Sequence, residues 1–77
     1  MYLILTCPAA EAEAAAARAT KIAGDNAEAK IWAKAARKWA TRARNCVLSG
    51  DRFQALTAEE MAKGAERAAL DCVQRRP

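Results

Sequence analysis

Apolar residues recur every three or four positions along most of this chain, which is the spacing of one face of an α-helix. The expected helices cover about residues 8–23, 26–48 and 58–74. Before them, residues 2–6 read YLILT, an apolar run that indicates a short extended arm over residues 1–7. The pattern therefore predicts an all-α fold with a single domain over residues 1–77. In this domain an antiparallel helical hairpin and a third helix form a small three-helix bundle.

The first helix has sequence signals at both ends. Pro8 suits the first turn, where its missing N–H costs no hydrogen bond, and Gly24 suits the position just past the last turn. Asp25, followed three residues later by Glu28, is typical of a capping box that opens the second helix. Because this connection is very short, we expect the first two helices to form a tight antiparallel hairpin.

The second connection is expected to be longer. The Ser-Gly pair at residues 49–50 should end the second helix, and residues 51–56 are predicted to form a linker. Phe53 and Leu56 within this linker are predicted to plug the end of the core. A second capping box, T-x-x-E at residues 57–60, is then expected to open the third helix.

Alanine accounts for 22 of the 77 residues. It is the best helix former but contributes little buried area, so the helices are strongly encoded while the core should be thin. On the first helix, alanine occupies every position of one heptad seam, which either permits unusually close helix packing or reflects composition alone. The seam positions are 9, 12, 16, 19 and 23. The third helix is predicted to face inward with Met61, Ala62, Ala65, Ala69, Cys72 and Val73.

A thin core predicts self-association, because a second subunit can supply the missing burial. We therefore expect a homo-oligomer. The candidate contact residues are Trp32, Trp39, Leu3, Ile4 and Leu5. Trp32 and Trp39 lie two turns apart on one face and are interpreted as core or subunit-interface residues rather than as a membrane-facing pair. The YLILT arm is a candidate for strand addition or swapping.

The second helix carries most of the positive charge. Residues 26–50 contain six basic residues and one acidic residue, Glu28. The basic residues are Lys30, Lys34, Arg37, Lys38, Arg42 and Arg44. All of them except Arg42 are predicted to line one side of the helix, opposite an apolar side that bears both tryptophans. Charge is thus sorted along the chain, with a net charge of +6 in residues 29–52 and −2 in the rest.

A cationic helix face predicts an anionic partner. An acidic protein surface is favoured, because such a face binds it with speed and specificity, and sequence-nonspecific contact with nucleic-acid phosphates is the alternative. No nucleic-acid-binding motif accompanies the basic residues, and a merely solvated polar face is the plain alternative to both. Small alanine-rich helical chains are frequent among phage-encoded inhibitors. On size and composition alone, an inhibitor or adaptor is the expected role.

Few residues support catalysis or metal binding. The chain has no histidine, one serine and three cysteines without a CxxC pair, so we expect no enzyme activity, no metal site and no cofactor. Cys46 and Cys72 are expected on core faces as reduced thiols of a cytoplasmic protein. The apolar run before Cys7 is too short for a signal sequence, and no stretch reaches the ~20 residues of a membrane span.

Overall fold

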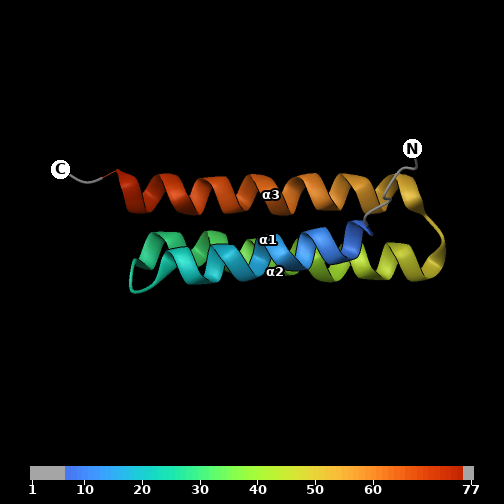
Figure 1. The fold of residues 1–77 in the computed structure, drawn as a ribbon, viewed down its shortest axis with the longest axis horizontal. Coiled ribbons are helices and arrows are strands. Elements are labelled where there is room, and N and C mark those ends of the chain that lie inside the picture. Colours follow the sequence, from blue (N-terminus) through green and yellow to red (C-terminus); the bar gives the residue numbers. More distant parts are fainter. Residues whose placement is uncertain (1–6, 76–77) are drawn as a thin grey trace, which may run out of the picture.

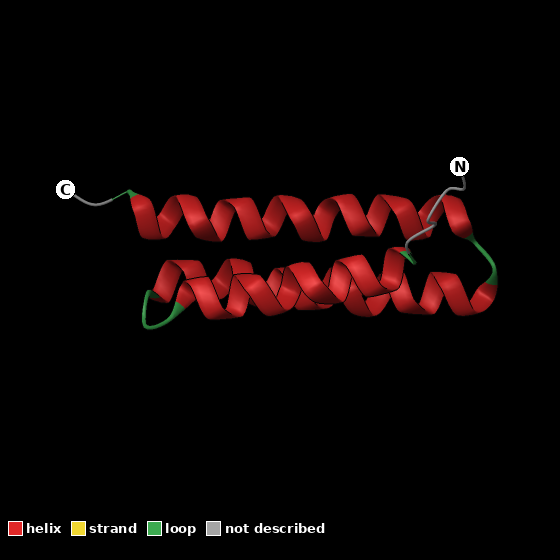
Figure 2. Ribbon diagram, in the orientation of Figure 1, coloured by secondary structure: helices red, strands yellow, loops and turns green. Residues whose placement is uncertain are grey.

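The computed structural model describes residues 7–75 and consists there of three α-helices without a strand (Figure 1, Figure 2). The helices are α1 (Pro8–Ala23), α2 (Ala27–Ser49) and α3 (Arg52–Gln74). Each runs antiparallel to the one before it, and each packs against both of the others. The predicted all-α three-helix bundle is therefore confirmed.

The turn between α1 and α2 is as short as predicted, but its cap is a different residue. Gly24 follows α1 with a φ of 50°, a conformation that favours glycine. The side chain of Asn26, one residue after the expected cap Asp25, accepts a hydrogen bond from the backbone N–H of Ala29 at 2.9 Å. The capping box predicted at Asp25 and Glu28 is therefore wrong. Asn26 performs that function because it immediately precedes the first helical residue.

The third helix begins six residues earlier than predicted. Gly50, with a φ of 84°, and Asp51 make the whole connection. The Asp51 carboxylate accepts a hydrogen bond from the backbone N–H of Gln54 at 3.0 Å, which caps α3 at its start. The linker predicted over residues 51–56 and the capping box at residues 57–60 are therefore wrong, because a stronger cap lies upstream of both.

The core is built from alanine. Every buried apolar residue in the central cluster is alanine, and the described part of the chain contains no large side chain that is fully buried. All five positions of the predicted seam on α1 are buried, which confirms that the seam is a packing surface. Alanine side chains this small allow helix axes to lie closer together than leucine or phenylalanine would permit.

Most of the large apolar side chains are displaced to the edges of the helix contacts. Phe53 is 80% exposed and Leu56 is 43% exposed, so neither plugs the core as predicted. Met61 is 46% exposed, so the inward placement predicted for it is wrong. Trp32 is 41% exposed, so of the two placements predicted for it, core or subunit interface, only the core is ruled out. The physical reason is that closely packed alanine faces leave no interior space that a large side chain could fill.

Several other residues that were predicted to face the core are neither fully buried nor fully exposed. Trp39, Cys72 and Val73 are half-buried and pack against the alanine core from its rim. The arm residues Leu3, Ile4 and Leu5, predicted for self-association, lie outside the described residues. Within residues 7–75, no helix has an apolar stretch long enough to cross a membrane.

Candidate binding surface

Positive charge is concentrated on one helix of the bundle. The helix α2 has six basic residues and a single acidic residue, Glu28. The helix α1 has two basic and two acidic residues, and α3 has three basic and four acidic residues. The electrostatic field of the described chain therefore originates mainly from α2.

A groove runs along the outer side of the contact between α1 and α2. It contains two neighbouring hollows of about 360 and 240 Å³, and Arg37 lines both. We call this groove the α1/α2 groove. Its lining residues include the basic side chains Lys30, Lys34, Arg37 and Arg44. Four of the six basic residues predicted as a binding face are thus brought together along one groove.

The floor of the α1/α2 groove is made of alanine. Ala16 and Ala40 lie under the first hollow, Ala23 and Ala33 lie under the second, and all four are buried. This floor is a direct consequence of the alanine seam, because small side chains leave a depression where larger ones would fill the surface. The sequence analysis missed the contribution of α1 to the site, although the seam positions on α1 were the signal that could have revealed it.

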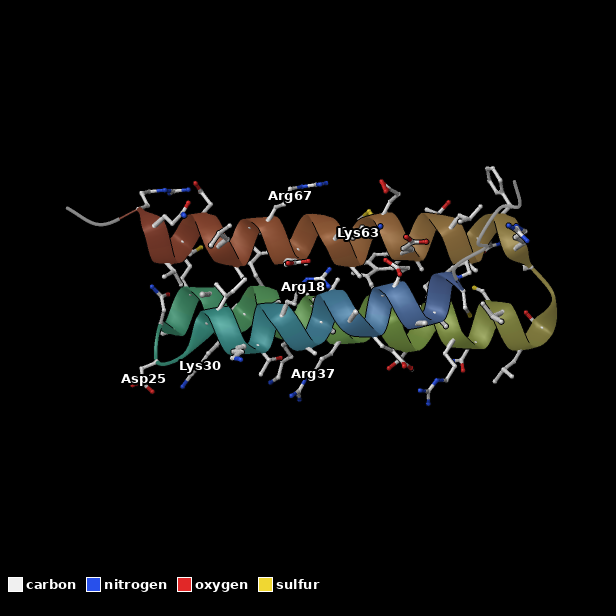
Figure 3. The ribbon with its side chains drawn as sticks, viewed as in Figure 1. Arg18, Asp25, Lys30, Arg37, Lys63 and Arg67 are labelled. Carbon is white, nitrogen blue, oxygen red and sulfur yellow. The ribbon has the colours of Figure 1, made fainter. Side chains whose placement is uncertain are left out.

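Most of the cations along this groove have no ion-pair partner among the residues that the structure describes. Arg44, at one end, forms an ion pair with Glu13 of α1. Among the ion pairs of residues 7–75, none involves Lys30, Lys34 or Arg37. Figure 3 shows Lys30 and Arg37 projecting from the edge of the bundle opposite α3. Their charges are therefore available to an external anion.

The contact between α1 and α3 is different, because its charges neutralise one another. Arg18 donates two hydrogen bonds to the Glu66 carboxylate, at 2.9 and 3.0 Å, and Figure 3 shows Arg18 directed toward α3. Lys63 forms ion pairs with Glu59 at 2.7 Å and with Glu11 at 3.9 Å. Hydrogen bonding to Glu66 raises the pKa of Arg18. This side of the bundle has little charge left for a partner.

Two of the predicted basic residues are placed away from the α1/α2 groove. The Arg42 guanidinium lies 5.9 Å from the centre of the Trp39 ring, within the range of a cation–π contact. Arg42 also lines a hollow of about 400 Å³ between α2 and α3, together with Trp39 and Phe53. Lys38 is exposed and lines neither hollow of the groove. The structure therefore divides the predicted binding face into a groove set of four residues and two outlying residues.

The three cysteines are free thiols. Cys7 is exposed at the start of α1 and makes no side-chain capping hydrogen bond, while Cys46 and Cys72 are half-buried. Within the described residues, no group of three or more histidine, cysteine, aspartate or glutamate side chains is arranged to hold a metal ion.

Cys72 should react slowly with alkylating reagents. Burial and a hydrogen bond with Glu28 raise the pKa of the Cys72 thiol, so less reactive thiolate is present at a given pH. We expect the midpoint of its pH–rate profile with iodoacetamide, followed by mass spectrometry, to be higher in the folded chain than in the same chain unfolded in urea. Equal midpoints in the two states would contradict the placement of Cys72 at the core rim.

Comparison of the chain with known protein families, with characterised proteins and with solved structures found no match.

Proposed function

We propose that this chain is a non-enzymatic binding module that docks an acidic protein surface in the α1/α2 groove. Its role would be that of a small inhibitor or adaptor, which acts through one surface and not through chemistry. The observation that supports this proposal is the row of Lys30, Lys34 and Arg37, which have no ion-pair partner within residues 7–75 and lie above a buried alanine floor. This arrangement occurs on α2 and has no counterpart on the charge-paired α1/α3 side.

The shape of the groove favours an acidic helix as the docking element. A helix can place small residues against the alanine floor while its aspartate and glutamate side chains reach the cations at the rim. Docking an amphipathic helix in a shallow groove is a common recognition mode, and complementary charge adds association rate and specificity. Because the floor alanines are already buried, the burial gained on docking would come from the exposed Ala17 and the methylene stems of the basic side chains around the floor.

Nucleic acid is the alternative partner for the same cations. Lysine and arginine side chains at intervals of one helical turn, about 5.4 Å, can follow a row of phosphates. However, single-stranded binders add aromatic platforms for the bases, and within residues 7–75 no aromatic side chain lines either hollow of the α1/α2 groove. The composition of the groove therefore favours a protein partner.

A titration with two probes of similar charge separates these alternatives. The probes are a fluorescent peptide that forms an acidic amphipathic helix and a duplex DNA of matched length, each at about 50 and about 150 mM salt. We expect the peptide to bind more tightly at both salt concentrations, because its apolar side chains add contact with the exposed apolar lining of the groove to the charge attraction.

The opposite ranking would overturn the proposal in favour of nucleic acid. In that case DNA affinity should also fall steeply with salt, because each neutralised phosphate releases a counterion. Absence of binding to either probe at the lower salt concentration would refute both functions of the groove.

A further inference from the structure

One stripe of α2 lies outside the α1/α2 groove and has an unusual symmetry. Its residues follow the helical spacing of four, three, four and three positions along one face. In order they are Glu28, Trp32, Ala35, Trp39 and Arg42. We call this set the α2 stripe. It carries opposite charges at its two ends, a tryptophan inside each charge, and an alanine at the centre.

The stripe is exposed enough to be contacted from outside. Glu28 and Arg42 are exposed, and Trp32 is 41% exposed. Trp39 and Ala35 are partly buried against the alanine core, so they are held in place while retaining an outer surface. Tryptophan is highly buried in most folded proteins, and two incompletely covered tryptophans on one stripe mark a contact surface.

We propose that the α2 stripe is the contact between two copies of this chain, which form an antiparallel two-fold dimer through α2. A two-fold axis perpendicular to α2 near Ala35 makes each copy of the stripe face the other in the reverse direction. Glu28 then lies beside Arg42 of the second copy, and the same pairing recurs on the other side of the axis. A two-fold interface requires this kind of self-complementarity.

The central part of the stripe is also complementary to the same part of a second copy that runs in the opposite direction. The small side chain of Ala35 leaves space at the axis, so the tryptophans of the two copies can interleave on either side of it. In this register Trp32 of one copy lies opposite position 38 of the second copy, beside Trp39 and one helical turn from Arg42. The surface there contains the hollow of about 400 Å³ lined by Trp39, Arg42 and Phe53. A tryptophan ring entering this hollow would contact two aromatic residues and a guanidinium.

The composition of the core explains why a second copy is needed. The monomer buries alanine methyl groups and leaves most of its large apolar side chains exposed or half-buried. Small domains with so little core often gain stability from association. Stacking two stripes against each other would cover the tryptophans of both copies in one step. It would not use the cations of the α1/α2 groove, so this inference is independent of the proposed function.

Sedimentation equilibrium of the full chain tests the dimer directly. We expect a concentration-dependent mass approaching that of two chains, and tryptophan emission that shifts to shorter wavelength as the dimer forms. Glu28→Arg and Arg42→Glu should each raise the dimer dissociation constant by at least about tenfold, because each places like charges opposite one another at both symmetric sites. Circular dichroism should show unchanged helix content in both variants.

Mixing the two variants provides the decisive measurement. A heterodimer of Glu28→Arg with Arg42→Glu pairs opposite charges at both sites, so the mixture should recover dimer affinity that neither variant has alone. Arg67→Glu makes the same change of charge as Arg42→Glu, but on an exposed residue of α3 that points away from the other helices in Figure 3. It is the matched control and should leave the dissociation constant within about threefold of wild type.

Two results would overturn the proposal. A wild-type chain that stays monomeric throughout the accessible concentration range would show that the α2 stripe does not join two copies. A dimer that is insensitive to both charge reversals, or that is not restored by mixing the variants, would place the interface elsewhere on the chain.

Discussion

Replacing Ala19 with leucine is expected to lower the free energy of unfolding by about 1–3 kcal/mol, the usual cost of overpacking a filled core. Ala19 is fully buried in the centre of the alanine cluster. A leucine there has no cavity to enter, so it must push α1 away from its neighbours and loosen several alanine contacts at once. Urea unfolding followed by circular dichroism measures this loss.

The matched control for this substitution is Ala17→Leu. Ala17 lies two residues away on the same helix and is exposed in the outer hollow of the α1/α2 groove, so a leucine there has space without displacing a packed helix. We expect its free energy of unfolding to stay within about 0.5 kcal/mol of wild type, as is usual for surface positions. A gain in stability for Ala19→Leu would show that the alanine contacts contain unfilled space, and the close packing described above would then be wrong.

Reversing two charges in the α1/α2 groove should abolish most binding to the acidic helical peptide. In the double variant Lys34→Glu with Arg37→Glu, two attractive charges at the rim become repulsive, so we expect the dissociation constant to rise by about 100-fold or more. Both side chains are exposed and have no ion-pair partner in residues 7–75, so helix content should be unchanged. Fluorescence anisotropy with the labelled peptide measures the change.

A second double variant separates the groove from the net charge of the protein. Arg52→Glu with Arg67→Glu changes the net charge by the same amount, but these exposed residues belong to α3, and Figure 3 shows Arg67 pointing away from the other helices. We expect this control to weaken binding only slightly. Equal losses in the two double variants would indicate long-range attraction without a specific site. Full binding by the groove variant would refute both an acidic protein and phosphate as partners of these cations.

Local sequence signals predicted both ends of α1 correctly but not the start of α3. The helix α1 begins at Pro8 and ends just before Gly24, as predicted, because each of these residues acts through its own backbone geometry. The start of α3 could not be predicted in the same way, because two capping signals compete along the chain. The signal at Asp51 comes first in the chain, and its carboxylate caps the helix by accepting a hydrogen bond from the Gln54 N–H. Thr57 then lies inside the helix, where its hydroxyl donates a hydrogen bond to the Phe53 carbonyl at 3.2 Å.

The candidate site was only partly accessible to sequence reasoning. Helical spacing correctly placed Lys30, Lys34 and Arg37 along one side of α2. It could not show that α1 supplies the other wall of the groove, because contacts between helices depend on residues far apart in the chain. The same limit applies to Arg18 and Glu66, which lie 48 residues apart and neutralise each other across the α1/α3 contact.

The sequence by itself determined the number of helices, the alanine seam of α1 and the row of cations on α2, because these depend on spacing and propensity within a single helix. Only the tertiary structure decided which surfaces those features form. Alanine faces pack closely and leave no interior volume, so the large apolar residues Trp32, Met61 and Phe53 remain at the edges of the helix contacts. The same close packing leaves the floor of the α1/α2 groove shallow and apolar beneath its cations.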